Sequence, residues 1–363
     1  MKSKRIQTLQ QKLHEKNIAA AAVLPSAGLF YLTKMTAGLS ERPMLFIFTA
    51  DGQSLAVCPA FEAERVRRDS GVTTLCTYSD EEGAAYGFKR LAEAVGRLES
   101  VAMEYQAARL LEYTLLRDHC GVSSLVDLRP ILAEQRMAKD AEEIRIMQRA
   151  ADLADAVMAN VESNLKPGVT ELEVVAAAQD FIKSQGARMS FITVIAGERS
   201  ALPHASTSAR PIELGDSVVV DLGCLVEGYS SDITRSFVVG NIDPEIEKIG
   251  QIVLEANRLA REAVRPGVTA QFVDSAARDY IVSQGYGKYF THRTGHGLGL
   301  EVHEEPYIVG GSNFELQVGH TFTIEPGIYL PGKGGVRIED DVYVVAGGGV
   351  SFTNYPRAVK VVK

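Results

Sequence analysis

The sequence predicts an α+β fold in two domains, and three observations support this fold class. The chain has 363 residues, of which 46% are hydrophobic, enough for a core in each of two domains. Its first third alternates short apolar runs with helical stretches, and its remainder contains an internal repeat in which helices precede strand-like runs. We place the boundary near Asp127 to Arg129, giving domains of residues 1–128 and 129–363.

The first domain is predicted to be an α/β unit. Short apolar runs such as IAAAAVLP (18–25), PMLFIFTADG (43–52) and SLAVCPA (54–60) are typical of buried strands. Helical stretches separate these runs. No residue pattern in this domain indicates chemistry.

The second domain carries an internal duplication. Residues 167–186 and 266–285 align without a gap at an offset of 99, and twelve of the twenty positions are identical. Amphipathic helical stretches near 141–164 and 244–264 precede the two copies. Two copies are too few for a solenoid, so we predict a half-domain duplicated about a pseudo-two-fold axis.

Charge and cysteine usage exclude several classes of protein. A net charge of -8 and a pI near 5.5 give no basic surface for nucleic acid or an anionic membrane, so a peptide or small-molecule substrate is expected. The cysteines lack CxxC spacing and are expected to be reduced thiols. The amino-terminal apolar run is too short for an export signal or a membrane span, which favours a cytoplasmic protein. The four cysteines are Cys58, Cys76, Cys120 and Cys224.

Two aspartates flank a predicted hairpin. Asp221 ends the apolar run SVVVDLG and Asp232 begins the return run, with Glu227 and Gly228 about midway. An antiparallel pairing would place the two carboxylates nearly opposite each other, with Cβ atoms ~5 Å apart. Facing carboxylates repel unless a cation or a shared proton lies between them. A pair of solvated strand-end aspartates is the alternative for these residues taken alone.

Strand periodicity assigns the side chains of the next acidic segment to two opposite faces. In HTFTIEPG, alternation places Thr321, Thr323 and Glu325 on one face and His320 on the other. We therefore expect Glu325 to point into a site. His320 is expected to have a structural role, as a partly buried or surface histidine.

The same alternation applies to GVRIEDDVYVV. Arg337, Glu339 and Asp341 fall on one face, and Asp340 falls on the opposite face. An arginine beside a ligating glutamate would keep that glutamate ionised and oriented.

Three histidines cluster in HRTGHGLGLEVHEEP (292–306). Its closely spaced glycines allow a close backbone approach but disfavour a helix, so this is not a helical HExxH zinc site. His292 and His296 share a face if the segment is extended. His204, in SALPHASTS, is a weaker candidate because a loop histidine beside a proline is commonly solvated.

Carboxylates with one imidazole form an oxygen-rich ligand set. Such a set favours Mn²⁺, Fe²⁺ or Co²⁺ over a structural zinc, although Zn²⁺ can also bind. Two ions would acidify a bridging water, hold a substrate carbonyl and stabilise a tetrahedral intermediate. The pattern therefore predicts a metal-dependent hydrolase with two divalent ions, of which Mn²⁺ is favoured.

At these residues the chain resembles the pita-bread metallopeptidases, in particular Xaa-Pro aminopeptidases and Xaa-Pro dipeptidases (prolidases). The resemblance implies a creatinase-like α/β amino-terminal domain followed by a duplicated pita-bread catalytic domain. It covers essentially the whole chain, and its most specific segments are DLGCLVEGYSSDITRSF, HRTGHGLGLEVHEEP, FTIEPGIY and GVRIED.

The resemblance implies a role for each metal ligand. Asp221 would chelate one ion, and Asp232 and Glu339 would bridge both. His296 and Glu325 would bind the other ion, with Glu325 also acting as a proton shuttle.

The resemblance also assigns residues to substrate. His303 would hydrogen-bond the substrate carbonyl or its oxyanion, so it counts with Glu325 and His204 as catalytic. His204 and His292 would line the substrate pocket. Arg337 would support Glu339 or the substrate.

The implied reaction is hydrolysis of the peptide bond before proline, in dipeptides or at the amino terminus of longer peptides, by a metal-bridging hydroxide. A homodimer is implied by resemblance alone. Methionine aminopeptidase shares the ligand pattern but usually lacks the large first domain, and creatinase shares both domains but works without metal. A non-catalytic binding module on the same scaffold is the alternative from a different class.

Overall fold

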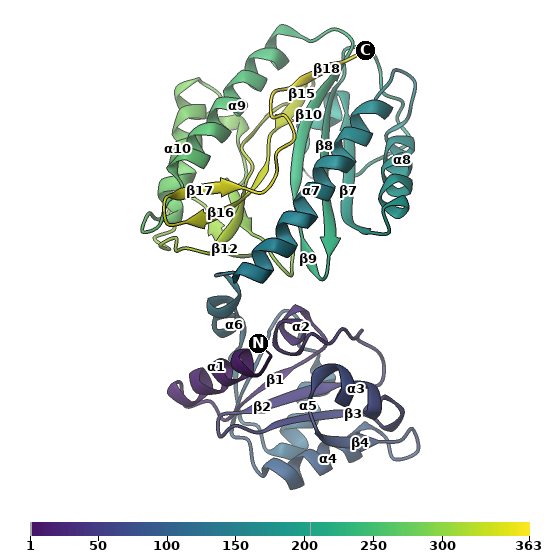
Figure 1. The fold of residues 1–363 in the computed structure, drawn as a ribbon, viewed down its shortest axis with the longest axis vertical. Coiled ribbons are helices and arrows are strands. Elements are labelled where there is room, and N and C mark those ends of the chain that lie inside the picture. The colour runs from purple at the N-terminus through teal and green to yellow at the C-terminus, as the bar shows by residue number, and fades with distance from the viewer. Residues whose placement is uncertain (1, 204) are drawn as a thin grey trace. The chain divides into compact units, whose positions relative to one another are not determined.

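The chain forms two compact units, Met1–Arg136 and Met137–Lys363 (Figure 1). The computed structural model describes residues 2–203 and 205–363. Each unit contains helices and its own sheets, which confirms the predicted α+β class. Helix α6 (Arg129–Arg136), which a division at residue 128 assigns to the second domain, lies in the first unit. The Tyr31 hydroxyl donates to the Gln135 carbonyl 2.9 Å away and ties the end of α6 to that unit.

The first unit is built on one mixed six-stranded sheet in the order β4-β3-β2-β1-β5-β6. Strand β2 pairs antiparallel with β1 and β3, and the other pairs are parallel. The strands are β1 (Ala20–Val23), β2 (Leu45–Thr49), β3 (Ser54–Pro59), β4 (Thr74–Tyr78), β5 (Ser100–Met103) and β6 (Ser124–Asp127). The other helices are α1 (Lys2–Glu15), α2 (Ala27–Thr33), α3 (Ala63–Ser70), α4 (Ala84–Val95) and α5 (Leu110–Cys120).

The first half of the second unit places two helices beside a sheet of order β18-β10-β8-β7, and β9 pairs with β8. Its apolar core joins both helices to β8 and β10, with Val157, Val174 and Val220 fully buried. The elements are α7 (Ala141–Asn164), α8 (Glu171–Ser184), β7 (Arg188–Ala196), β8 (Ser217–Val226), β9 (Tyr229–Ser230), β10 (Ile233–Val239) and β18 (Lys360–Val362).

The second half repeats the helix pair and adds a sheet of order β12-β11-β13-β16-β17 and the ribbon β14-β15. Figure 1 shows the pairs α7–α8 and α9–α10 flanking the strands of this unit. The elements are α9 (Pro244–Ala263), α10 (Ala270–Ser283), β11 (Gly295–Gly297), β12 (Glu304–Ile308), β13 (Thr321–Ile324), β14 (Gly327–Leu330), β15 (Gly334–Arg337), β16 (Asp340–Val345) and β17 (Gly348–Ser351).

The repeated sequence folds the same way twice. Thr170 and Thr269 are the N-caps of α8 and α10, and each hydroxyl accepts a hydrogen bond from the backbone N–H three residues later. Gly168 and Gly267, in the preceding Pro-Gly turns, have φ of 85° and 84°, a conformation that favours glycine. The duplication seen in the sequence is therefore a duplication of structure.

Candidate metal centre and substrate cavity

Acidic and imidazole side chains from both halves of the second unit meet at its sheets. Asp221 lies on β8 and Asp232 immediately precedes β10, whereas His296 lies on β11. Glu325 follows β13, and Glu339 lies between β15 and β16. Each half therefore supplies carboxylates.

The hairpin register differs from the facing pair expected from the sequence. Asp221 pairs with Thr234, so Asp232 is a diagonal neighbour two residues away on the same face of the strand. The two turn residues are Glu227 and Gly228, with φ of 47° and 87°. This turn lies slightly beyond the midpoint between the two aspartates and shifts the partner of Asp221 to Thr234.

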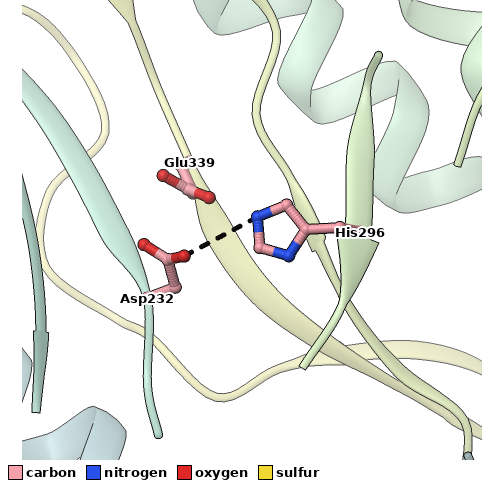
Figure 2. A group of neighbouring side chains, drawn as sticks. All are labelled: Asp232, His296 and Glu339. Carbon is pink, nitrogen blue, oxygen red and sulfur yellow. Dashed lines mark ion pairs between the residues drawn. The ribbon is translucent and has the colours of Figure 1, made fainter. Parts of the chain in front are cut away.

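Asp232, His296 and Glu339 form the tightest group (Figure 2). Each offers one ligand atom, these atoms lie within 4.8 Å of one another, and all three residues are buried. Nε2 of His296 lies 3.7 Å from Oδ2 of Asp232. Nδ1 of His296 lies 3.1 Å from the Gly297 carbonyl, which can only accept, so the hydrogen sits on Nδ1 and the Nε2 lone pair faces the carboxylates.

The electrostatics of this group favour a cation. Burial raises the pKa of the Asp232 and Glu339 carboxyls well above their usual range, and neighbouring carboxylates raise it further. Burial, with His303 nearby, lowers the pKa of the His296 imidazole to about 3, so the ring is neutral and able to ligate. A bound cation would offset the repulsion among the carboxylates.

Glu325 and Asp221 lie beside this three-residue group. Oε1 of Glu325 is 3.5 Å from Nε2 of His296, and burial raises the pKa of Glu325 to about 7. Oδ2 of Asp221 accepts a hydrogen bond of 2.6 Å from Nη2 of Arg337. The Oδ1 atoms of Asp221 and Asp232 are buried without a hydrogen-bond donor. Such acceptors in a carboxylate cluster fit a divalent cation.

A hydrogen-bond network supports the carboxylates. Oγ1 of Thr234 donates to Oε2 of Glu339 at 2.6 Å and accepts from Nε of Arg337 at 3.0 Å. The Tyr329 hydroxyl accepts from Nη1 of Arg337 at 3.2 Å and lies 2.8 Å from Nε2 of His292. Nδ1 of His292 lies 2.7 Å from a backbone carbonyl, so it carries the hydrogen and Nε2 accepts from Tyr329.

All the described side chains predicted for the site line one cavity of about 630 Å³. The ring of His303 lies edge-on to that of His296, with centroids 4.1 Å apart. The prediction for His204 lies outside the described residues. The predicted residues in the lining are Asp221, Asp232, His292, His296, His303, Glu325, Arg337 and Glu339.

His320 does not line this cavity. It is 4% exposed, its ring stacks on Phe314, and its Nδ1 accepts from the Gln317 N–H at 3.1 Å. Its location fits the expected structural role, although it is buried rather than at the surface.

Sequence reasoning left several residues of the site unassigned, among them Thr234, Tyr329 and Arg293. Thr234 and Tyr329 join Arg337 to its neighbours, and Arg293 lines the cavity. Thr234 lies two residues after Asp232, so strand alternation could have placed it on the same face. Arg293 is adjacent to His292. No pattern in the sequence singles out Tyr329.

The fold and this site define a metallopeptidase. Residues 145–346 match metallopeptidase family M24, and residues 5–138 match the creatinase/prolidase N-terminal domain. The chain therefore belongs to metallopeptidase family M24, which confirms the family predicted from its motifs.

Relatives and solved structures cover the whole chain. It is 38% identical over 360 residues to the putative dipeptidase YkvY of Bacillus subtilis, covering 97% of this chain and 98% of that protein. It is 35% identical over 359 residues to the Xaa-Pro dipeptidase of Pyrococcus furiosus, with the same coverage. The crystal structure of a recombinant prolidase from Thermococcus sibiricus matches with a TM-score of 0.94 and 35% identity, covering 100% of this chain and 99% of that one. Among the described residues, no helix has the length and apolar character needed to cross a membrane.

Proposed function

We propose that this protein is a metal-dependent exopeptidase that hydrolyses the Xaa-Pro bond of dipeptides, or the first bond of longer peptides with proline second. The observation that carries the proposal is the buried group of Asp232, His296 and Glu339 at a cavity that His292 and His303 also line. Relatives named as a putative dipeptidase, an Xaa-Pro dipeptidase and a prolidase support the substrate class.

Five residues would hold two divalent cations. Asp221, Asp232 and Glu339 supply carboxylates from β8, the start of β10 and the β15–β16 connection, while His296 and Glu325 complete the set. This oxygen-rich set suits Mn²⁺, with Co²⁺, Fe²⁺ or Zn²⁺ as alternatives. When bound, two such ions would supply Lewis-acid chemistry: they would lower the pKa of water, so that hydroxide is available near neutral pH, and would polarise the scissile carbonyl.

Glu325 is the group suited to move protons. Burial raises its pKa to about 7 in the metal-free protein, and beside the bound ions its carboxylate would take a proton from water and release it again. That proton passes to the proline nitrogen, which leaves as a secondary amine when the C–N bond breaks. The oxygen of the same water would form the new bond to the carbonyl carbon, so the bond formed and the bond broken balance without a further acid.

Two imidazoles and a guanidinium position the substrate and the ligands. We assign His303 to the substrate carbonyl, where a donated hydrogen bond stabilises negative charge on oxygen. Through Tyr329, His292 joins Arg337, which holds Asp221 and Thr234. His204 is assigned to the pocket by resemblance.

Selectivity for proline would come from the shape of the cavity. The bond before proline is a tertiary amide without an N–H, so an N–H at that bond cannot be the recognised feature. Phe191, Pro203 and Val302 give the cavity an apolar wall that the substrate can contact.

The test compares three peptides that differ in one feature each. Metal-stripped protein, with and without added Mn²⁺, is given an Xaa-Pro dipeptide, the matching Xaa-Ala dipeptide and an Xaa-Pro-Yaa tripeptide. Metal-dependent cleavage of the Xaa-Pro dipeptide alone would identify a dipeptidase, and cleavage of the tripeptide an aminopeptidase. Equal cleavage of the Xaa-Ala dipeptide would contradict proline selectivity. If no peptide is cleaved in a metal-dependent way, the creatinase-like hydrolase and the non-catalytic binding module would become the favoured alternatives.

A further inference from the structure

Arg235 is a buried cation directly behind the candidate metal centre. It lies on β10, one residue after Thr234, and is 1% exposed. It is not among the residues that line the cavity. A fully buried arginine is rare unless its charge and its N–H groups are satisfied, and here each of its three nitrogens donates.

One end of the guanidinium holds the backbone at the centre. Nη1 of Arg235 donates to the carbonyl of Glu339 at 2.5 Å and to the carbonyl of Thr234 at 2.9 Å. The N–H of Glu339 donates to the same Thr234 carbonyl at 3.1 Å. Residues of β10 therefore hydrogen-bond both the N–H and the C=O of Glu339. Asp232 immediately precedes the same strand.

The other side of the guanidinium is fixed by the carboxyl-terminal segment. Nη2 donates to the Tyr355 carbonyl and to Oδ1 of Asp340, both at 2.8 Å. Nε donates to the Pro356 carbonyl at 3.0 Å. Arg235 therefore connects the Glu339 backbone to a segment more than one hundred residues away from β10 in the sequence.

Charge pairing with Asp340 does not by itself require Arg235. Nε of Arg357 donates to Oδ2 of Asp340 at 2.8 Å, and Oγ1 of Thr353 donates to its Oδ1 at 2.9 Å. Arg357 gives this carboxylate a second cationic partner, and none of the hydrogen bonds described for it reaches Glu339. Arg235 contacts the Glu339 carbonyl, and Arg357 does not.

We propose that Arg235 is a positioning residue of the metal centre, which pre-sets Glu339 relative to Asp232 by anchoring the Glu339 backbone to the backbone of Tyr355 and Pro356. This inference rests on the proposed function, because it needs Glu339 to bind metal. Groups that orient metal ligands typically change metal affinity by about 10–100-fold when removed. A lysine at this position keeps the charge but cannot reproduce the planar fork of donors.

The experiment measures Mn²⁺ binding to the metal-stripped full chain by titration calorimetry. The variants are Arg235→Lys and, as the matched control, Arg357→Lys, which perturbs the same Asp340 but not Glu339. We expect Arg235→Lys to weaken Mn²⁺ binding by roughly 10–100-fold and Arg357→Lys to leave it near the wild-type value. Circular dichroism melting establishes that each variant is folded at the assay temperature. Equal Mn²⁺ affinities for the two variants would overturn the inference.

A measurement on the wild-type protein tests the same point without a substitution. If Glu339 is pre-set, its backbone N–H should exchange with solvent as slowly in metal-free protein as the amides in the middle of β10. Fast exchange that becomes slow only after Mn²⁺ is added would overturn the inference. Wild-type protein that binds no Mn²⁺ would instead overturn the proposed function, and this inference with it.

Discussion

Glu171 should control the segment that brings Pro203 to the wall of the cavity. Its carboxylate is fully buried at the first position of α8. It accepts hydrogen bonds from Ala196, the last residue of β7, and from Arg199 and Ser208, which follow β7. Oε1 accepts from the Ala196 N–H at 2.8 Å, and Oε2 accepts from the Ser208 N–H at 2.7 Å. Nη1 of Arg199 donates to both oxygens, at 2.8 and 2.7 Å.

These contacts set the loss of stability expected when Glu171 is replaced by glutamine. Glutamine keeps one acceptor oxygen and turns the other position into a donor. Either amide orientation therefore opposes a buried backbone N–H, of Ala196 or Ser208, and removes the charge that pairs with Arg199. One unmet buried donor and one weakened charged hydrogen bond together lower the free energy of unfolding by about 2–4 kcal/mol. At 2–4 °C per kcal/mol this corresponds to a fall in Tm of roughly 4–16 °C.

The assay for Glu171→Gln combines thermal melting with steady-state kinetics on an Xaa-Pro dipeptide. We expect KM to rise several-fold while kcat changes little, because the carboxylate holds a cavity wall and not the ligand group. Glu173→Gln is the control, since Glu173 closes the capping box of the same helix at the surface and glutamine can keep that box. Unchanged melting and KM for Glu171→Gln would refute the reasoning.

Three further predictions concern the centre. Glu339→Gln should abolish turnover and leave the circular dichroism spectrum unchanged, and near-normal activity would contradict the ligand assignment. Mn²⁺ affinity, measured by calorimetry from pH 5 to 8, should rise with pH. The pKa of Glu325 in metal-free protein is raised to about 7, so below pH 7 the ion must displace a proton to bind. Affinity should therefore fall about tenfold or more for each pH unit below 7. A flat profile over that range would exclude this competition. Thr234→Val removes the donor to Glu339 and the acceptor for Arg337, and should lower kcat/KM by about 10–150-fold in steady-state assays, whereas a loss under threefold would show that these bonds do not matter.

Local patterns predicted correctly that Glu325 and Glu339 face the site, whereas Asp341, which they placed on the same face as Glu339, does not line the cavity. Strand alternation separates Glu325 from Phe322 and Ile324, which lie in the apolar core, and separates Glu339 from Asp340. Asp340 points away from the cavity into its contacts with Arg235 and Arg357. These placements depend only on residues close together in the chain, so they can be predicted from the sequence.

Contacts between distant segments could not be predicted in this way. The pairing of Asp221 with Thr234 depends on which residues form the turn, and a small shift of that turn changes the partner. The contact of Arg235 with Glu339 joins residues 104 positions apart. Neither strand period nor composition encodes such a contact.

Some expectations stay predictions. A cytoplasmic location, a homodimer and Mn²⁺ as the native metal rest on the sequence and its resemblance to relatives. The choice of native metal depends on cellular supply as well as on ligands.

The most direct test of the central claim is a titration of metal-stripped protein with Mn²⁺ in which bound metal and hydrolysis of an Xaa-Pro dipeptide are followed together. The proposed two-ion centre predicts no hydrolysis without metal and full activity only as the second equivalent binds. Full activity in metal-free protein, or saturation of both signals at one equivalent, would contradict it.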